Sequence, residues 1–384
     1  MMKLLRTFLA TFAVLFAAAP AAHAQSSWTG VARIVVIGDL HGDYAKFADM
    51  LRDAGLTDER GNWIGGRTHL VQLGDVPDRA PNTRQILDEL IRLEPQARRA
   101  GGYVHALIGN HEAMNMEGDL RYTTPGEFAA FADRNSPRVR AQLYQRTVAY
   151  LRAHPPAGGL PAFDDAYRAQ WEATHPLGYA EHAAAWAPSG VYGRWVAGHD
   201  AVIRINDMLF MHGGLGPGFN TVDRDAMNNA VRAALRGHPV AAYPDIESNQ
   251  NGPLWYRGLA LNPESTEQSN LDALLSAQGV TRVVVGHTKR ASTVLPRFNG
   301  HVILTDIAVP SGFTDPHSYL IVENGALTTV YRGHRVPMQA DTPAQTCAYL
   351  AQIAAIDANA GPNATLAAQC SGAVDATASA GTAQ

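Results

Sequence analysis

Cysteine is scarce in this chain of 384 residues, which contains only Cys347 and Cys370. Both lie near the C-terminus, far in sequence from the polar motifs described below, and this distance argues against a cysteine nucleophile. In an exported chain such a pair often forms a disulfide. The alternative is two free cysteines in a mobile tail.

An excess of positive charge is also missing. The chain has 31 Lys and Arg against 35 Asp and Glu, a formal net charge of −4, whereas nucleic-acid binders are usually basic. We therefore expect no nucleic-acid partner. Charged residues make up 17% and hydrophobic residues 46% of the chain, which fits a soluble globular protein. The length suits one large domain with an insertion, or two domains.

Long hydrophobic runs are absent after the first 24 residues. Within those residues, Lys3 and Arg6 precede an apolar stretch over 8–19, and Ala22-His23-Ala24 is a small-x-small cleavage site before Gln25. This pattern predicts a signal peptide over residues 1–24 and an exported protein, periplasmic or secreted. The apolar stretch is short for a membrane span, although a retained N-terminal anchor is the alternative. We expect no stable membrane span.

Six short polar motifs stand out in what the sequence does contain, and five of them lie where an apolar run ends. The motifs are Gly38-Asp39-Leu40-His41-Gly42, Gly74-Asp75-Val76-Pro77-Asp78-Arg79, Gly109-Asn110-His111-Glu112, Met211-His212-Gly213-Gly214, Trp255-Tyr256-Arg257-Gly258 and Gly286-His287-Thr288. A single Gly-Asp is an ordinary turn, and the glycines suit sharp turns. Carboxylate, amide and imidazole groups at five run ends instead indicate a metal site, because divalent ions take these ligands.

The apolar runs have β-strand character and alternate with helical patterns. Strands are expected at residues 33–37, 69–73, 103–108, 208–211, 282–285 and 301–304, and helices at 44–54 and 83–93. Asn324-Gly325 between apolar runs predicts a β-hairpin. The alternation indicates an α/β protein, in which ligands bind beyond the carboxyl ends of the strands.

Four segments follow from this pattern: a signal peptide at 1–24, a catalytic domain at 25–118 and 197–336, an insertion at 119–196 and an Ala-rich tail at 337–384. Helical spacing at 125–133 and 137–154 predicts a mostly helical cap over the site. A structural excursion away from the substrate is the alternative. In the tail we expect a short helix at 348–356 and disorder at 373–384.

Other polar residues are expected to have supporting roles. Asp43 and Glu112 flank the motifs and suit helix starts or contacts behind the ligands. Asn110 taken alone also suits a turn. Four histidines in or beside apolar runs are expected to be hydrogen-bonded structural residues: His69, His105, His199 and His301.

The order of the motifs resembles the calcineurin-like metallophosphoesterases, and within them the phosphoprotein-phosphatase branch. Residues 115–122, read Asn-Met-Glu-Gly-Asp-Leu-Arg-Tyr, and residues 252–258, read Gly-Pro-Leu-Trp-Tyr-Arg-Gly, resemble the bacterial Shewanella-like phosphatases more closely still. The resemblance covers roughly residues 31–332. It implies a β-sandwich flanked by helices, with a helical insertion.

The resemblance also implies two divalent metal ions. The implied ligands are Asp39 and His41 for one ion, Asn110, His212 and His287 for the other, and Asp75 for both. Two such ions can activate a bridging water as a hydroxide nucleophile, so no covalent nucleophile is needed. Mixed oxygen and nitrogen donors accept Mn, Fe or Zn, which leaves the identity of the metals open.

The remaining motif residues are implied to act on the substrate. The resemblance makes His111 the general acid for the leaving group, oriented by Asp78. Arg79 and Arg257 would bind the phosphate, and Asn110 would contact it as well.

Two positions depart from the family pattern. Ala80 stands where the family usually has Gly after Asp-Arg, which puts the local turn geometry in doubt. Thr288 stands where many phosphodiesterase members have a second histidine, and this favours the phosphatase branch.

We therefore expect an exported, metal-dependent phosphatase acting on a phosphorylated small molecule or phosphoprotein, with aryl monoesters such as phosphotyrosine favoured. Hydrolysis of a nucleotide or dinucleoside polyphosphate is an alternative. A non-catalytic metal or phosphate sensor is another, although the full set of catalytic residues argues against it. Four aromatic residues of the insertion could contact an aryl leaving group or form the core of the insertion: Tyr122, Tyr179, Trp186 and Tyr192.

Overall fold

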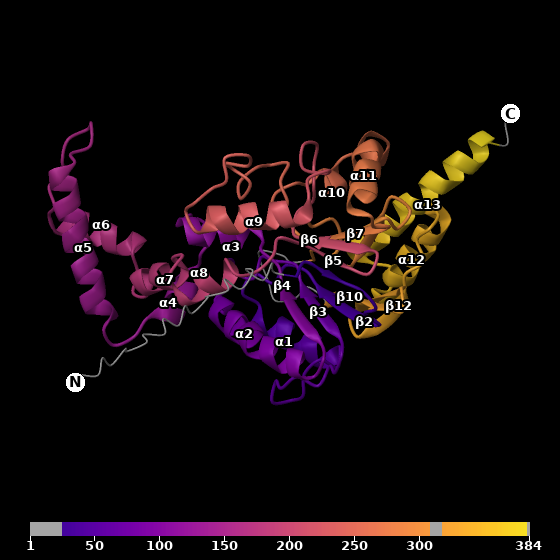
Figure 1. The fold of residues 1–384 in the computed structure, drawn as a ribbon, viewed down its shortest axis with the longest axis horizontal. Helices are drawn as coiled ribbons and strands as arrows, with labels where there is room; N and C mark the ends of the chain where they lie inside the picture. Colours follow the sequence, from indigo (N-terminus) through magenta and orange to yellow (C-terminus); the bar gives the residue numbers. More distant parts are fainter. Residues whose placement is uncertain (1–24, 308–316, 382–384) are drawn as a thin grey trace, which may run out of the picture.

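Two mixed β-sheets flanked by helices form the body of the protein, as the computed structural model shows for residues 25–307 and 317–381 (Figure 1). The predicted signal peptide therefore lies outside the described residues. One continuous apolar core contains strand residues of both sheets together with the helices that cover them. The α/β sandwich expected from the sequence is confirmed.

The first sheet has six strands, of which the three on one side, ending at the sheet edge, are parallel. Its strands in spatial order are β12 (His334–Pro337), β11 (Ala326–Tyr331), β10 (Ser318–Glu323), β2 (Arg33–Ile37), β3 (His69–Gln72) and β4 (Tyr103–Ala106). Strands β10 and β11 pair antiparallel around Asn324 and Gly325, which both have positive φ, as a tight hairpin turn requires. The predicted hairpin is confirmed.

The second sheet also has six strands. In spatial order they are β1 (Ser27–Trp28), β5 (Val202–Ile205), β6 (Met208–Met211), β7 (Arg282–Val285), β9 (Val302–Leu304) and β8 (Leu295–Arg297). Strands β6, β7 and β9 run parallel. The short strands β1, β5, β8 and β12 were not expected from the sequence, because two to four residues show little periodicity.

The register of the parallel strands aligns their carboxyl ends. In the first sheet Ile37 pairs with Gln72, and Gln72 pairs with Ala106. In the second sheet Met211 pairs with Val285, which pairs with Leu304. Five of the six polar motifs begin within a few residues of these ends, so the fold gathers them at one edge of the sandwich.

Helices cover both sheets and form the insertion. Those of the body are α1 (Tyr44–Asp53), α2 (Thr83–Arg99), α3 (Asn110–Glu117), α9 (Arg224–Leu235), α10 (Gly258–Leu261) and α11 (Glu264–Gln278). Helix α2 continues beyond Leu93, where the expected helix ended, and runs through Pro95, because Leu93 and Ala97 extend its buried face. Packing on the core therefore outweighs the cost of an internal proline.

The insertion is mostly helical, as expected. Its helices are α4 (Pro125–Phe131), α5 (Ser136–Ala153), α6 (Asp165–Thr174), α7 (Tyr179–Trp186) and α8 (Val191–Val196). Helices α4, α7 and α8 lie against the body, whereas α5 and α6 stand at the far end of the molecule, away from the sheets (Figure 1). One part of the insertion therefore lies next to the body, and another part extends away from it (Figure 1).

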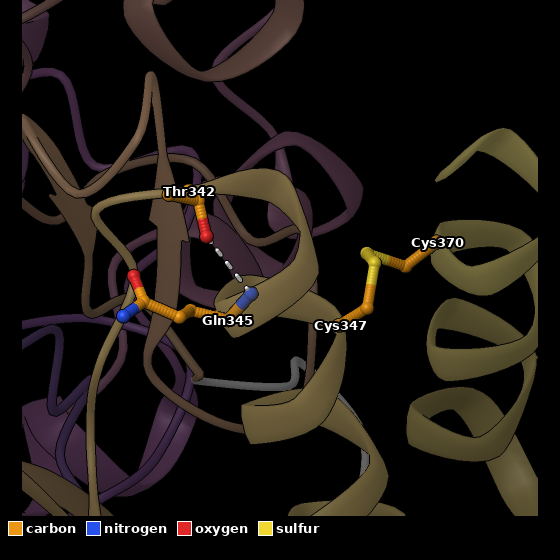
Figure 2. Close-up of a disulfide and its surroundings, with 4 residues drawn as sticks. All are labelled: Thr342, Gln345, Cys347 and Cys370. Atoms are coloured by element: carbon orange, nitrogen blue, oxygen red, sulfur yellow. Dashed lines mark hydrogen bonds between the residues drawn. A yellow bond between two sulfur atoms is a disulfide. The ribbon is translucent and has the colours of Figure 1, made fainter. Parts of the chain in front are cut away.

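The C-terminal segment corrects one expectation. Helices α12 (Pro343–Ile356) and α13 (Gly361–Gly381) follow the sheets, so residues 373–381 are helical rather than disordered. Alanine has the highest helix propensity, and the Cys347–Cys370 disulfide joins α13 to α12 (Figure 2). Thr342 starts α12 by accepting a hydrogen bond from the backbone N–H of Gln345 at 3.3 Å (Figure 2). The predicted disulfide is confirmed.

Among the described residues, no helix combines the length and the apolar character that crossing a membrane requires.

Candidate active site

Hydrogen bonds between side chains and backbone groups join the two sheets where the motifs meet. The backbone N–H of His287, after β7, donates to Asp39 Oδ1, after β2, at 3.0 Å. The ring of His212, after β6, donates through Nδ1 to the carbonyl oxygen of Leu73, after β3, at 2.8 Å. Residues far apart in sequence therefore converge in one buried cluster.

Four predicted ligands form the first group of this cluster. His212 Nε2 lies 2.9 Å from Asn110 Oδ1, 3.1 Å from His287 Nδ1 and 3.2 Å from Asp75 Oδ1. All four side chains are buried. Two atoms that each lie about 2 Å from one ion can be at most about 4 Å apart, so these donors fit a common divalent ion.

A second group lies on the other side of Asp75. His41 Nε2 is 3.8 Å from both Asp39 Oδ2 and Asp75 Oδ2. Asp75 therefore contributes one carboxylate oxygen to each group, which fits the bridging role that the sequence implied. His111 Nε2 also lies 3.8 Å from Asp75 Oδ2, so its ring borders the cluster as well.

The histidine tautomers provide an independent test of whether the residues fit a metal. His41 donates through Nδ1 to Pro77 O at 3.0 Å, and His287 donates through Nε2 to Trp255 O at 3.2 Å. His212 uses Nδ1 in the same way. When each ring is neutral, its other nitrogen carries a lone pair that faces the cluster, which is the usual arrangement of metal-binding histidines.

Burial and mutual charge shift the pKa values across the cluster. Burial lowers the pKa of His41 to about 3. Burial also opposes the charge on His212, but Asp75 and Asp39 outweigh it and raise its pKa to about 9. The pKa of Asp39 is raised well above its usual value by burial and by Asp306. Close carboxylates and imidazoles in a dry site are the donor set that a divalent cation would stabilise.

His111 has the environment expected of a positioned acid. Its Nδ1 lies 2.5 Å from Asp78 Oδ2, and its Nε2 lies 3.3 Å from Arg79 Nη2. Burial lowers the pKa of His111, but Asp75 and Asp78 outweigh burial and raise it. Asp78 is itself held by Thr123 Oγ1, which donates to Asp78 Oδ1 at 2.8 Å. The structure therefore brings His111, the predicted general acid, together with Asp78 and with Arg79, one of the two arginines predicted to bind phosphate.

Arg257, the other residue predicted to bind phosphate, lies beside the loop that follows β7. Arg257 is exposed, and its Nη1 donates to His287 O at 2.9 Å and to Thr288 Oγ1 at 3.1 Å. These contacts tie the guanidinium to the loop after β7. Thr288, which stands where many phosphodiesterase members have a second histidine, thus contacts this arginine.

Left-handed backbone conformations concentrate in the cluster. His41, Asp75, Asp78, Arg79 and His287 all have φ between 46° and 75°. Each such residue costs on the order of 1–3 kcal/mol, which the surrounding hydrogen bonds must offset. Ala80 is not among the residues with positive φ, so the departure at that position leaves the turn intact.

The motif glycines serve close packing more than turning. Of the four at strand ends, only Gly74 has positive φ, at 90°. A Cβ atom on Gly286 would lie 2.4 Å from Asp39 Oδ1, which leaves no room for a side chain. Only glycine therefore permits this contact between the sheets.

Several supporting residues were missed or only partly foreseen from the sequence. Glu112 accepts the backbone N–H groups of Asp75, Val76 and Gly109 at 2.8–2.9 Å, and burial and Asp75 raise its pKa to about 7. Glu112 was expected as a flanking group, and this arrangement confirms that reading. Asp306, buried after β9, was overlooked although it follows an apolar run as the other acids do.

Glu127 was also missed. Its carboxylate accepts the backbone N–H of Asp78 at 2.8 Å and the hydroxyl of Thr83 at 2.5 Å. It also closes a capping box with Thr124 at the start of α4. The pattern Thr124-x-x-Glu127 is a readable helix-start signal, but its contact with Asp78 is not visible in sequence.

The polar residues that were expected to have supporting roles have them in the structure. Asp43 caps α1 through the backbone N–H of Lys46 at 3.1 Å, as expected. The four structural histidines have the hydrogen bonds expected of them: His69 with His105, His199 with Glu94, and His301 with Thr281.

Of the four insertion aromatics, Trp186 and Tyr192 are buried in the core and Tyr179 packs on Phe128. Only Tyr122 reaches the site, with its ring centroid 5.1 Å from that of His111.

Comparison with known proteins agrees with this geometry. Residues 32–291 match the family described as calcineurin-like phosphoesterase. The chain is 32% identical to Shewanella-like protein phosphatase 2 of Arabidopsis thaliana over 292 residues, which covers 74% of this chain and 73% of that protein. It is 25% identical to Shewanella-like protein phosphatase 1 of Plasmodium berghei, over 79% of this chain and 74% of the relative.

A solved structure of similar fold is a cold-active protein tyrosine phosphatase, with a TM-score of 0.63 and 27% identity over 83% of this chain and 82% of that one. The cold-active protein-tyrosine phosphatase of a psychrophilic Shewanella species has a TM-score of 0.61, 26% identity and coverage of 82% of this chain and 83% of that one. Family, relatives and site agree: this chain belongs to the calcineurin-like phosphoesterases and is a phosphoric monoester hydrolase similar to the Shewanella-like protein phosphatases.

Proposed function

We propose that this protein hydrolyses phosphate monoesters with two divalent ions and favours aryl esters such as phosphotyrosine. The observation that carries the proposal is the position of His111. Its ring borders the ligand cluster, is held by Asp78, lies beside Arg79 and has an exposed tyrosine ring against it.

The ligand cluster would hold the two ions. Asn110, His212 and His287 would bind one, Asp39 and His41 the other, and Asp75 would contribute an oxygen to each. When bound, divalent ions would supply an activated water and neutralise charge on the phosphate. The donor types accept Mn, Fe or Zn.

His111 and the arginines would act on the substrate itself. Asp78 accepts the Nδ1 proton of His111, so Nε2 is the atom that faces the site and would protonate the leaving oxygen. Arg79 lies beside His111 and Arg257 beside His287, and both carry guanidinium groups that can bind phosphate oxygens. Asn110 would contact the phosphate from the cluster.

Tyr122 supports the preference for aryl esters. Its side chain is 45% exposed, its ring is tilted by 39° against that of His111, and Arg79 lies over its face at 5.7 Å. A leaving group that receives a proton from His111 must therefore depart beside this ring. An aromatic ring there can stack on Tyr122, a contact worth roughly 0.5–1.5 kcal/mol beyond its burial.

The test compares kcat/KM for phosphotyrosine, phosphoserine, a nucleoside monophosphate, a dinucleoside polyphosphate and a bis-aryl diester under one metal condition. Phosphotyrosine should be the best substrate. A superior diester would refute the monoesterase reading, and a superior nucleotide would support the nucleotide hydrolase instead. Binding of metal and phosphate without any turnover would identify a sensor.

Two variants test the contribution of the Tyr122 ring to the preference for aryl esters. Tyr122→Ala should lower the ratio of kcat/KM for phosphotyrosine over phosphoserine by roughly 2- to 12-fold, whereas Tyr122→Phe should keep it. Tyr150→Ala, an exposed tyrosine on α5, is the matched control. An unchanged ratio in Tyr122→Ala would remove the stacking contact from the proposal.

Metal number is tested by elemental analysis. The wild type should contain two ions per chain, and Asp75→Asn should weaken both sites because the shared carboxylate is lost. Asp165→Asn, on the exposed start of α6, should retain both ions. Full occupancy and activity in Asp75→Asn would exclude a bridging role.

Export is part of the same proposal. It rests on the sequence pattern over residues 1–24, with a mature chain that begins at Gln25, and the disulfide Cys347–Cys370 is compatible with an oxidising compartment. N-terminal sequencing of the soluble protein from the producing cell tests it. Recovery of a chain that begins at Met1 would refute it.

A further inference from the structure

Helices α5 and α6 form an arm, defined here as residues 136–174, that has a small core of its own. Tyr144 and Val148 of α5 pack against Trp171 of α6, separately from the main core. Ser136 Oγ donates to Glu181 Oε1 at 2.7 Å, which fixes the base of the arm to α7. The rest of α5 stands away from the sheets (Figure 1). Its outward face is therefore not used to stabilise the body.

That outward face is basic. Helix α5 contains four arginines and no acidic residue. Arg140 is used internally, where it pairs with Glu172 at 3.1 Å. Arg138, Arg146 and Arg152 are exposed and have no carboxylate partner among the described residues, and neither does Arg134 just before the helix. These four arginines form the basic row discussed below.

The basic row contrasts with the rest of the chain. The protein has a formal net charge of −4, and no acidic residue occurs between Asp133 and Asp164. Helical spacing places Arg138, Arg146 and Arg152 within about one third of the circumference of α5, at 100° per residue. The guanidinium of Arg152 lies over the ring of Phe163, 5.4 Å from its centroid, so this arginine has an aromatic contact but no carboxylate partner among the described residues. Like charges on one helix face repel each other when no carboxylate neutralises them, so this arrangement favours a partner of opposite charge.

We propose that the basic row binds an acidic segment of a phosphoprotein substrate. This proposal rests on the proposed function, because it assigns the row to the substrate of the same site. Arg134 follows Tyr122 by 12 residues, and α4 between them holds Asp78 through Glu127. A substrate whose phosphate reaches His111 therefore lies at the end of the insertion from which the row extends.

The chemistry of the arm favours a protein segment over a membrane surface. A helix that inserts into a membrane interface presents an apolar face to the lipid. Tyr144 and Val148 of α5 are covered because they pack on α6, which leaves Tyr150 as the one large hydrophobic side chain of α5 that is exposed. The free face presents guanidinium groups, which bind carboxylates in a planar, bidentate geometry.

The experiment uses the full-length protein and three phosphotyrosine peptides that differ only in a tail of ten Glu, ten Gln or ten Lys. An extended ten-residue tail spans about 33–36 Å, enough to follow a helix of the length of α5. The arm variant is Arg138→Gln, Arg146→Gln and Arg152→Gln. The control variant, Arg60→Gln, Arg99→Gln and Arg335→Gln, removes the same charge from exposed positions outside the arm.

For the wild type we expect kcat/KM at low salt to be about tenfold or more higher with the Glu tail than with the Gln tail, mainly through KM, and to lose this preference at high salt. The arm variant should lose the preference and the control variant should keep it. Hydrolysis of p-nitrophenyl phosphate should be unchanged in both, because neither alters the catalytic residues.

An arm variant that retains the full preference for the Glu tail would overturn the proposal. So would binding to phosphatidylglycerol vesicles that depends on the row while the tail preference does not, because the partner would then be a membrane. Fluorescence anisotropy with an unphosphorylated Glu-tailed peptide measures docking without catalysis. If p-nitrophenyl phosphate is not hydrolysed, the proposed function fails, while the anisotropy result still supports or refutes the row as an acid-binding surface.

Discussion

The carboxylate of Glu112 accepts the backbone N–H of Asp75 at 2.9 Å, so the helix that follows β4 holds the loop that follows β3. The same oxygen accepts the N–H of Gly109 at 2.8 Å, and the other oxygen accepts that of Val76 at 2.8 Å. One buried side chain therefore fixes the backbone on both sides of the candidate bridging ligand. Its position explains how Asp75 keeps a left-handed conformation.

Glu112→Gln should loosen this arrangement. A carboxamide can accept at only one of its two positions, so at least one backbone N–H would face an NH₂ group. We expect roughly 10–100-fold weaker metal binding with the fold retained, the usual cost of losing support behind a ligand. Calorimetric titration with Mn²⁺ measures the change, and Glu117→Gln at the exposed end of α3 is the control. Equal affinity in both variants would contradict the role.

His111→Asn should retain the metals and the fold but reduce turnover by roughly 10²–10⁴-fold, the scale of general acid catalysis. The loss should be smaller for p-nitrophenyl phosphate than for phosphoserine, because p-nitrophenolate departs without needing a proton. Steady-state kinetics with both substrates, alongside elemental analysis, decide the point. An equal loss for both leaving groups, or a loss of metal, would make His111 a ligand rather than the acid.

Because His182 is buried, we predict that the insertion loses stability in acid. The His182 side chain is buried among Phe128, Phe131 and Trp186, and neither of its ring nitrogens has a hydrogen-bond partner among the described residues. Burial lowers its pKa to about 4, partly opposed by Asp78. A depressed histidine pKa means that the folded state binds fewer protons than the unfolded state. The folded state therefore has its full stability, as far as His182 is concerned, above about pH 6.5, and it loses stability as the pH falls towards 4.

The pH dependence can be isolated by His182→Leu, which removes the titrating group. From pH 7 to pH 5 the wild type should lose about 2 kcal/mol more of its free energy of unfolding than the variant does. Urea unfolding at pH 5, 6 and 7 measures both proteins. If the free energies of unfolding of the wild type and the variant fall equally between pH 7 and pH 5, His182 does not take up a proton on unfolding.

The disulfide should stabilise the C-terminal helices without affecting the chemistry. Cys347 and Cys370 are separated by 23 residues, and a closed loop of this size limits the entropy of the unfolded chain by about 3 kcal/mol. The double variant Cys347→Ser and Cys370→Ser should expose α13 to proteolysis and lower stability by that order. Turnover of p-nitrophenyl phosphate should persist. A variant that resists protease as well as the wild type does would show that packing alone holds α13.

The local pattern of the sequence was enough to predict the central strands and the ligand types. Apolar runs such as residues 33–37 and 282–285 are buried on both faces, so they read as strands without any partner being known. A carboxylate, amide or imidazole just beyond each run is then predicted to lie at a sheet edge. The short strands β1, β5, β8 and β12 were missed because their pairing partners, rather than their own residues, define them.

The helical tail and the roles of the glycines also depended on packing. Residues 373–381 have a composition typical of disorder, yet they continue a helix that a disulfide joins to α12. Gly286 was expected to serve a turn, but the carboxylate of Asp39 occupies the space where a Cβ atom would lie. Neither relation can be read from a single segment, because each joins residues that are distant in the chain.

By itself, the sequence determined which side chains are candidates for the chemistry, since the Asp, Asn and His residues that recur at strand ends are of the types that bind divalent metals. Only the tertiary structure decided how they act together. It separated Tyr122, which lies against His111, from Trp186 and Tyr192, which are core residues. It also placed Glu112 and Glu127 behind the loops of Asp75 and Asp78. The physical reason is that hydrogen bonds and charge depend on distances of a few ångströms, which only the packing of two sheets and an insertion sets.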